Sequence, residues 1–195
     1  MIRKEYKFLL NDYELKHFFS YYSSELKNLY PDRTITSLYF DTLNFEIFNY
    51  NSSNDIDKYT YRFRSYNSNK ILNEIKFNNI NKSKTVNETT YKNFNEINCV
   101  VYQNKLLFPS VFTHYIRSYY QLGNTRVTLD RHIKFSSHSF RSAHKKSFNE
   151  KVNILEMKLQ DNKNDLNIEK NLFSNPQAFS KFNEATRKLY FYEVK

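Results

Sequence analysis

Charged side chains recur at every second position along several short segments of this sequence. An aromatic or apolar residue such as Tyr6, Phe63 or Met157 lies between them. Because successive side chains of a β-strand point to opposite faces, each segment predicts a strand with one charged face and one apolar face. The charged residues of these segments are, in chain order, Arg3, Glu5, Lys7, Arg62, Arg64, Glu74, Lys76, Arg117, Arg126, Asp130, Glu156 and Lys158.

Most of these charges are positive, and cations held close together repel one another and lose hydration. A bound polyanion relieves both costs. Arginine suits phosphate because its planar fork donates two parallel hydrogen bonds, and lysine adds a compact charge. The carboxylates among the cations are the oxygen ligands that Mg²⁺ or Mn²⁺ uses when it bridges phosphates. The pattern therefore predicts a phosphoryl-transfer site, in which positioning and charge stabilisation supply most of the catalysis.

For any single strand, the simpler interpretation is a charged face in water, because charged residues are rarely buried unless paired. Two features of the whole set favour an enclosed face instead. The charges are mostly cations rather than a neutral mixture, and the pattern Glu-x-Lys occurs twice, at Glu74–Lys76 and at Glu156–Lys158. We therefore expect Arg62 and Arg64 to face an interior site.

The elements that must position these residues are strands with a few helices. Helices are predicted over 12–29, with Asn11 as N-cap and Pro31 as terminator, and over 95–107, 163–173 and 177–190. The dipeptide "GN" at 123–124 predicts a tight hairpin. Strands are predicted over 2–9, 34–41, 58–66, 70–78, 83–91, 111–121, 125–134 and 152–160. We expect an α+β fold in which eight antiparallel strands form a closed barrel, with the helices packed outside.

Composition narrows the possible functions. The 195 residues predict one domain, 1–195, and a net charge of +10 favours an anionic partner. A single glycine, Gly123, excludes glycine-rich phosphate loops, so side chains must bind any phosphate. The lone Cys99 excludes a disulfide framework and is expected to be a buried, inert thiol. With no signal core and no membrane span, a cytoplasmic location is expected.

Several conspicuous residues are not expected to do chemistry. The histidines lack the spacing of a metal site, and Asp41 in "SLYFDT" is expected to be structural. The asparagine-rich segment 49–57 is expected to be a loop, and the basic segment 141–147 a solvated loop that could recruit anions. No specific nucleic-acid site is predicted, because the charges alternate over many strands rather than forming one patch.

The chain resembles the catalytic domain of the VTC (vacuolar transporter chaperone) family, within the triphosphate tunnel metalloenzyme superfamily. The first motif has the form R-x-E-x-K, which is similar to the VTC branch rather than to the ExExK opening of the CYTH branch. The motifs occur in the family's order over nearly the whole chain and are "RKEYKF" (3–8), "SLYFDT" (37–42), "YRFRSY" (61–66), "NEIKF" (73–77), "RVTLD" (126–130), "LEMKL" (155–159) and "FSKF" (179–182).

This resemblance implies a closed eight-stranded tunnel that binds triphosphate or polyphosphate, and a reaction that moves the terminal phosphoryl group of ATP onto a polyphosphate chain. It implies Mn²⁺ or Mg²⁺ as cofactor, with Glu156 as metal ligand. Glu74 could either bind metal or hold a neighbouring cation in place. The implied phosphate-binding and catalytic residues are Lys7, Arg62, Arg64, Lys76, Arg117, Arg126, Lys158 and Lys181, with Lys84 as a further phosphate-binding position.

Three other functions remain open from the sequence. A triphosphatase acting on inorganic, nucleoside or RNA 5′-triphosphates would use the same residues with water as the attacking group. A non-catalytic polyphosphate-binding module would keep the arginines without needing the metal site. A nucleic-acid-binding protein would suit the basic charge and the many aromatic residues.

Overall fold

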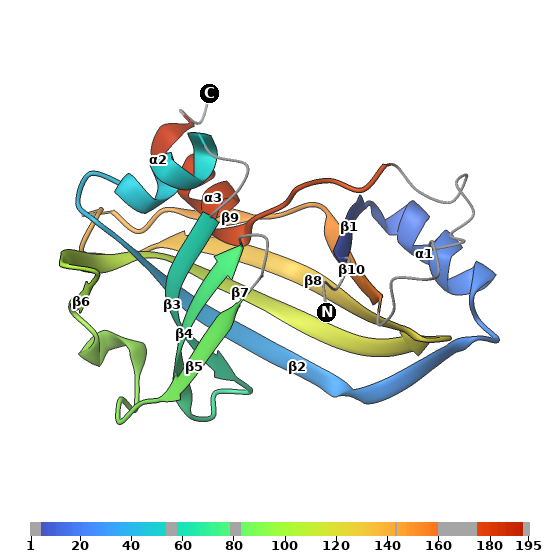
Figure 1. Ribbon diagram of the computed structural model, residues 1–195. Helices are drawn as coiled ribbons and strands as arrows, with labels where there is room; N and C mark the ends of the chain where they lie inside the picture. The colour runs from blue at the N-terminus through green and yellow to red at the C-terminus, as the bar shows by residue number, and fades with distance from the viewer. Residues whose placement is uncertain (1–4, 54–57, 79–82, 143, 160–174, 193–195) are drawn as a thin grey trace. The chain divides into compact units, whose positions relative to one another are not determined.

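The computed structural model describes residues 5–53, 58–78, 83–142, 144–159 and 175–192 (Figure 1). They form an α+β structure dominated by antiparallel sheet. The strands are β1 (Glu5–Leu10), β2 (Leu26–Asp41), β3 (Lys58–Tyr66), β4 (Ile71–Asn78), β5 (Lys84–Glu88), β6 (Val100–Tyr102), β7 (Lys105–Leu122), β8 (Thr125–Ser137), β9 (Ser147–Asn149) and β10 (Asn153–Leu159). The helices are α1 (Asp12–Tyr21), α2 (Glu46–Ser53) and α3 (Lys181–Thr186), with a 3₁₀ turn at Phe94–Glu96 and a π-helical turn at Arg187–Phe191.

The chain divides into two compact units. Unit 1 comprises Met1–Arg33, Tyr115–Ile133 and Glu150–Phe179. Unit 2 comprises Thr34–His114, Lys134–Asn149 and Ser180–Lys195. The long strands β2, β7 and β8 contribute residues to both units.

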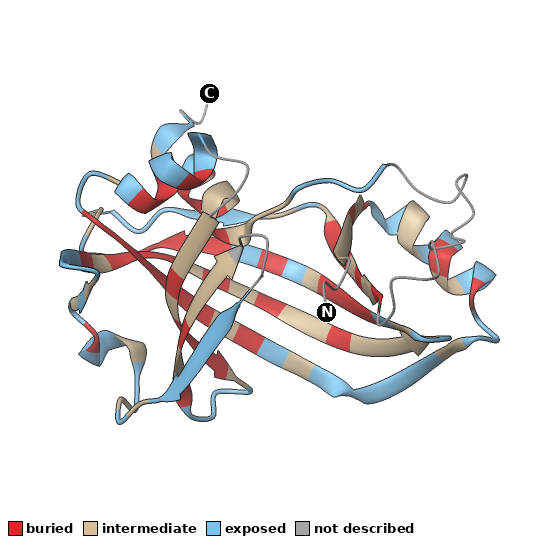
Figure 2. Cartoon of the chain, viewed as in Figure 1, coloured by how far each residue is buried: buried red, intermediate tan, exposed pale blue. Residues whose placement is uncertain are grey.

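All eight predicted strands are present, but the predicted closure of the barrel is wrong. The hydrogen-bonded order is β1-β10-β8-β7-β2-β3-β4-β5, and within the described residues it does not return from β5 to β1. Strand β5 has only five residues, all exposed, with Lys84 and Glu88 at its ends (pale blue in Figure 2). A short, charged strand of this kind is typical of a sheet edge that is protected against further pairing.

The core of unit 1 lies between helix α1 and the apolar faces of three strands. Phe18 and Tyr22 pack against side chains that include Phe8, Leu155 and Met157. As predicted, Asn11 caps α1: its side chain accepts the Glu14 N–H, and the Glu14 carboxylate accepts the Asn11 N–H. This arrangement places the apolar residues between the charged positions of β1, β8 and β10 in the core.

The predicted helix 12–29 is too long, and the predicted helix 95–107 is wrong. Helix α1 ends at Tyr21 instead of continuing to residue 29, and Pro31 lies within the exposed first part of β2, where a missing N–H is tolerated. The predicted helix 95–107 is a hairpin of β6 and β7, because Gln103 and Asn104 both adopt positive φ angles. Two successive residues with positive φ form the tight turn that suits the twist of a hairpin.

This hairpin also changes the environment of Cys99, which is exposed rather than buried. The prediction of a buried thiol depended on an apolar helix, and residues 97–99 belong to neither a helix nor a strand. The predicted hairpin at 123–124 is confirmed: β7 ends at Leu122, β8 begins at Thr125, and Gly123 has a φ of 53°.

Three further predicted segments remain to be compared with the structure: the asparagine-rich loop and the helices at 163–173 and 177–190. Residues 49–53 of the asparagine-rich segment, expected to be a loop, belong to helix α2, and residues 54–57 lie outside the described residues. The predicted helix 177–190 is present from Lys181 onward as α3 and the π-helical turn. In Figure 1, α2 and α3 lie next to each other above β3. The predicted helix 163–173 lies outside the described residues.

Candidate functional site

In unit 1, neighbouring strands place the predicted site residues on one face of the sheet. β1 pairs with β10 so that Lys7 lies opposite Glu156 and Glu5 lies opposite Lys158. β10 pairs with β8 so that Lys158 also lies opposite Arg126. Directly opposite residues of antiparallel strands share a face, so these five side chains belong to one surface. We call them, with Arg117 and Asp130, the unit 1 cluster.

Ion pairs hold the lysines of the unit 1 cluster in defined positions. Lys158 Nζ lies 2.8 Å from Glu156 Oε1 and 3.3 Å from Glu5 Oε2. Lys7 Nζ lies 3.5 Å from Glu5 Oε1 and donates a hydrogen bond of 3.0 Å to the carbonyl oxygen of Phe179. The sequence segment that precedes α3 therefore fixes Lys7, together with a backbone hydrogen bond from Gln177 N–H to the Lys7 carbonyl.

Glu156 and Arg117 are charged groups of this cluster whose pKa values are shifted by their neighbours. Burial by itself would raise the pKa of Glu156, but Lys158, Arg117 and Lys7 lower it well below its usual range. Arg117 donates from Nε to Asp130 Oδ1 at 2.5 Å and from Nη2 to Asp130 Oδ2 at 2.7 Å. This bidentate pair opposes the effect of burial and raises the pKa of Arg117. Both groups are therefore ionised at neutral pH.

In unit 2, Glu74 is the centre of a second group of charges. Its Oε2 accepts a hydrogen bond of 2.8 Å from Arg62 Nε and lies 3.6 Å from Arg64 Nη1. Its Oε1 accepts a hydrogen bond of 2.6 Å from Lys84 Nζ. These residues come from the adjacent strands β3, β4 and β5, which pair with Arg62 opposite Glu74. The Glu74 side chain is only 1% exposed.

Two further cations belong to the same group. Lys76 lies two residues after Glu74 on β4, opposite Lys84 in the register. Lys181 begins α3 and acts electrostatically on Tyr39 of β2. We call Arg62, Arg64, Glu74, Lys76, Lys84 and Lys181 the unit 2 cluster; it comprises five cations and one carboxylate.

Arg62 and Arg64, which were expected to face an interior site, have little contact with solvent. Their side chains are 11% and 5% exposed, and Arg64 Nε donates to Ser37 Oγ at 2.8 Å. On the other face of β3, Tyr61 and Phe63 are buried as well. Both faces of β3 are thus covered, and its arginines are held by named partners rather than by solvent.

The model of the VTC domain family matches residues 2–97 and 78–190 of the chain. The chain belongs to the VTC domain family. Both matched segments together include every residue of the unit 1 and unit 2 clusters. A comparison with curated proteins found no match.

Among solved structures, the PH1819 protein from Pyrococcus horikoshii shares the fold of this VTC domain, with a TM-score of 0.58 and 12% identity over 95% of this chain and 99% of that chain. A candidate adenylate cyclase from Vibrio parahaemolyticus gives a TM-score of 0.48 at 12% identity, covering 83% of this chain and 78% of that chain. The Hippeastrum protein HpAC1, a candidate adenylyl cyclase described as having a dominant triphosphatase activity, gives 0.46 at 13% identity, covering 83% and 80%.

The unit 1 cluster of the VTC domain has the donor atoms that a hard divalent cation requires. Glu156 contacts Lys158 through Oε1, whereas both oxygens of Glu5 already contact lysines, Oε1 that of Lys7 and Oε2 that of Lys158. Thr128 lies opposite Glu156 in the register, and its Oγ1 is buried without a hydrogen-bond partner among the described residues. Mg²⁺ is commonly bound by one or two carboxylates together with substrate oxygens. The residues present therefore fit a Mg²⁺ or Mn²⁺ ion at Glu156.

Glu74 has a different environment from Glu156. Both of its oxygens already bond to cations, and although burial raises its pKa, Arg62, Arg64 and Lys84 lower it to about 2. This geometry favours the second alternative for Glu74, in which it holds neighbouring cations in place. Within the described parts of the chain, no group of three or more His, Cys, Asp or Glu residues is arranged to hold a metal ion.

Tyr39 is a site residue that the sequence interpretation missed. It lies opposite Arg62 in the register of β2 and β3, and its hydroxyl oxygen accepts a hydrogen bond of 3.0 Å from Arg62 Nη1. The alternation in "SLYFDT" separates Ser37, Tyr39 and Asp41 from the apolar Leu38 and Phe40. That separation indicated that Tyr39 lies on the polar face of its strand, but it could not show that this strand would pair with the one that carries Arg62.

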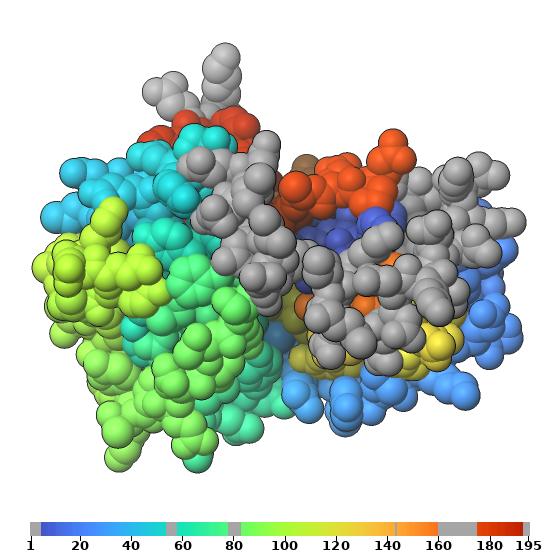
Figure 3. Space-filling model, in the orientation of Figure 1, coloured from blue at the N-terminus to red at the C-terminus, as the bar shows by residue number. Residues whose placement is uncertain are grey.

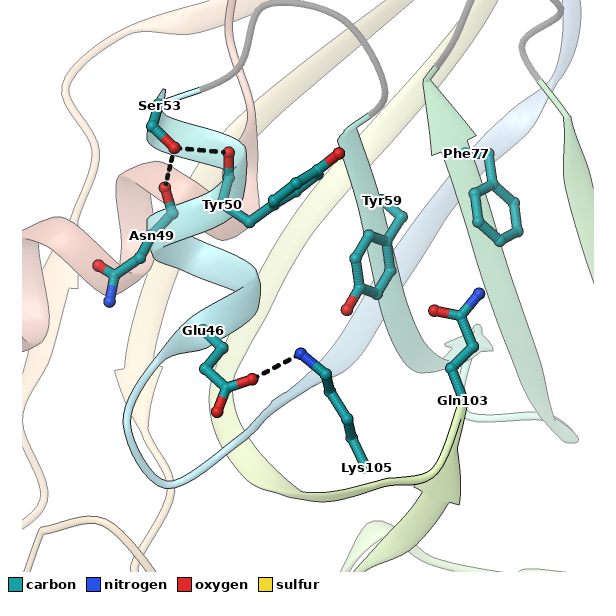
Figure 4. Close-up of a pocket in the computed structure, with 8 residues that line it drawn as sticks. All are labelled: Glu46, Asn49, Tyr50, Ser53, Tyr59, Phe77, Gln103 and Lys105. Atoms are coloured by element: carbon teal, nitrogen blue, oxygen red, sulfur yellow. Dashed lines mark hydrogen bonds and ion pairs between the residues drawn. The ribbon is translucent and has the colours of Figure 1, made fainter.

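A groove of about 870 Å³ lies on the other face of the β3–β4 pair (Figure 4). Tyr50, Tyr59, Phe77 and Gln103 line it beside an ion pair between Lys105 and Glu46, whose charged atoms are 2.6 Å apart. Tyr59 alternates with Thr60 and Arg62 along β3, so the groove faces away from the unit 2 cluster. None of the predicted site residues lines it.

Asp41 and Arg141 are structural, and for Arg141 this differs from the expected solvated loop. Arg141 donates hydrogen bonds to the carbonyl oxygens of Asp41, Thr42 and Leu43 and lies 4.4 Å from the centre of the Phe45 ring. Arg141 therefore stabilises the connection between β2 and α2.

Among the described residues, no helix combines the length and the hydropathy that crossing a bilayer requires.

Proposed function

We propose that this VTC domain is a metal-dependent phosphoryl-transfer enzyme that binds triphosphate or polyphosphate and extends a polyphosphate chain with ATP as the donor. The observation that carries the proposal is the composition of the unit 2 cluster, in which five cations accompany one carboxylate. Arg64 is buried there and the side chain of Arg62 is only 11% exposed, so their charges act on a bound anion with little screening by water. A chain of phosphoryl groups supplies many negative charges in a small volume.

The roles within the site follow from the residue types. In the unit 2 cluster, Arg62, Arg64, Lys76, Lys84 and Lys181 would bind phosphoryl oxygens, while Glu74 keeps the arginines oriented. In the unit 1 cluster, Lys7, Arg117, Arg126 and Lys158 would have the same binding role. Glu156, with Thr128, would hold Mg²⁺ or Mn²⁺, and Glu5 would orient the two lysines that it contacts. Such a metal, when bound, would polarise phosphoryl oxygens. The protein residues supply the alignment and the charge stabilisation on which phosphoryl transfer mainly depends.

We also propose that residues 1–195 act as one functional domain. The VTC family model matches segments that fall in both compact units. The long strands β2, β7 and β8 contribute residues to both units.

The test is to incubate the full chain with ATP and Mn²⁺ and to separate the products by length. We expect long polyphosphate chains. Free orthophosphate without chains would contradict polymerisation and support the triphosphatase alternative, in which water is the attacking group.

Glu156→Gln separates catalysis from binding in the same assay. The amide keeps the size of the side chain but loses the charge that a divalent metal needs, so turnover should fall by roughly 100-fold or more. Binding of tripolyphosphate should persist, because the cations remain. A variant with wild-type turnover would refute the metal assignment, and a wild-type chain that binds tripolyphosphate without any turnover would favour a non-catalytic binding module.

A further inference from the structure

Tyr39 has an unusual position for a buried tyrosine, because its hydroxyl lies among cations. The residue is 3% exposed, and its ring stacks on Phe182 of α3 with the ring centres 5.3 Å apart. Arg62 contacts it twice: Nη1 donates to the hydroxyl oxygen at 3.0 Å, and Cζ lies 5.6 Å from the ring centre. The phenol is therefore fixed in place by packing and by one arginine.

Among the described residues, the charged groups that act on Tyr39 lie on β3 and α3. Arg62 and Arg64 approach from β3, and Lys181 approaches from α3. Glu74 and Lys84, on β4 and β5, connect to this group through Arg62 and through each other. Asp41, on the same face of β2, is directed elsewhere, because both of its oxygens accept backbone N–H groups of residues 42, 47 and 48.

This environment makes the phenol acidic. Burial by itself raises the pKa of Tyr39, but Arg62, Arg64 and Lys181 together lower it to about 8. The phenol is thus neutral below pH 8 and becomes an anion above it. Other tyrosines of the same unit behave in the opposite way, since burial raises the pKa of Tyr61.

We propose that Tyr39 is a positioning residue that also sets the charge of the unit 2 cluster, and that its ionisation competes with phosphate binding. As a neutral phenol it accepts the hydrogen bond from Arg62 and adds no negative charge to the cluster. As a phenolate it places a negative charge beside Arg62, Arg64 and Lys181. This inference rests on the proposed phosphate-binding function of the cluster.

The coupling must act in both directions. If the phenolate weakens phosphate binding, then bound phosphate must favour the neutral phenol and raise the pKa of Tyr39, because linkage is reciprocal. Near pH 8, binding of a phosphate anion should therefore be accompanied by proton uptake at Tyr39. No direct contact between the phenol and the ligand is required for this effect.

The experiment measures tripolyphosphate binding to the full chain by calorimetry from neutral pH to above pH 8, with tyrosinate absorbance recorded in parallel. Tyr39→Phe keeps the stacking ring and removes the ionisable hydroxyl. Tyr61→Phe is the matched control, because Tyr61 lies on the opposite face of β3 and its hydroxyl accepts a hydrogen bond from Asn73. The Tyr39→Phe protein also provides the baseline for protons that the ligand itself takes up.

We expect wild-type and Tyr61→Phe affinities to fall roughly fivefold or more as the pH rises through the Tyr39 transition, relative to Tyr39→Phe. Tyrosinate absorbance near pH 8 should decrease when tripolyphosphate is added to wild type, and should not change in Tyr39→Phe. Equal pH profiles of wild type and Tyr39→Phe, or an unchanged absorbance, would overturn this inference alone. A wild-type protein that binds no tripolyphosphate at any pH would overturn the proposed function and this inference with it.

Discussion

Glu74 shows how much one buried carboxylate can contribute to this structure. Its pKa is lowered to about 2 because Arg62, Arg64 and Lys84 outweigh the effect of burial. A carboxylate with a depressed pKa in the folded state contributes stability that is present above its unfolded pKa, near 4.5, and is lost as the pH falls toward 2. The charged form of Glu74 is therefore part of what holds β3, β4 and β5 together.

At the residue scale, we predict that Glu74→Gln removes this pH-dependent contribution. The difference in the free energy of unfolding between wild type and variant should be about 3 kcal/mol at neutral pH and should shrink toward zero between pH 4.5 and pH 2. Urea unfolding at a series of pH values measures it. Glu88→Gln is the control, because Glu88 is 75% exposed and its pair with Lys70 should contribute little. A constant difference across this pH range would show that Glu74 is not held ionised by its partners.

At the element scale, helix α2 depends on a carboxylate outside the helix. Asp41 Oδ1 accepts the N–H groups of Thr42 and Ile47, at 2.7 and 2.8 Å, and Oδ2 accepts that of Phe48 at 3.0 Å. Two of these donors belong to the first turn of α2, which no residue of the helix itself can satisfy. Burial raises the pKa of Asp41 to about 6 although these three hydrogen bonds lower it, so the group is ionised at neutral pH.

We predict that Asp41→Ala lowers the free energy of unfolding by about 1–3 kcal/mol, because three buried N–H groups lose their acceptor. Asp41→Asn should lose less, since its amide oxygen can still accept at the position of Oδ1. Thermal and urea unfolding measure both variants. If Asp41→Ala were as stable as wild type, the first turn of α2 would not need this cap.

At the scale of the whole molecule, the net charge of +10 favours binding of anions and disfavours the compact state through self-repulsion. The exposed strand β5, on the face drawn in Figure 3 (green), contributes nothing to this excess, because Lys84 and Glu88 balance each other. A ligand that binds only the folded state raises its apparent stability in proportion to the logarithm of its concentration. Specific phosphate binding and general screening can therefore be separated by comparing ligands at equal ionic strength.

We predict that tripolyphosphate at about 100 times its Kd raises the Tm by roughly 5–10 °C, whereas sodium chloride of equal ionic strength does not. Arg62→Ala should lose most of this shift while it folds as wild type does, because Arg64 and Lys84 still pair with Glu74. Lys105→Ala is the matched control: it removes one cation from the exposed pair with Glu46, outside the unit 2 cluster. Equal shifts in both variants would indicate non-specific binding to the net positive charge.

The alternation of residues along the chain determined the strands of this protein and the chemistry of their two faces. All eight predicted strands are present, and the residues between the charged positions of β1, β8 and β10 form the core with α1. These features depend only on the period of the side chains, which is a local property of an extended chain. The capping box of α1 and the turn at Gly123 were also predictable, because each depends on residues that are close in the sequence.

The tertiary structure alone decided which charges meet. Arg62 is opposite both Tyr39 and Glu74 because β3 pairs with β2 and β4, and Asp41 caps a helix because α2 follows the strand at that angle. The end of the strand order at β5 likewise depends on which strands pair. A pattern within one strand carries no information about its partner strands, so the sequence alone indicated a cationic site but not the tyrosine and the carboxylate that organise it.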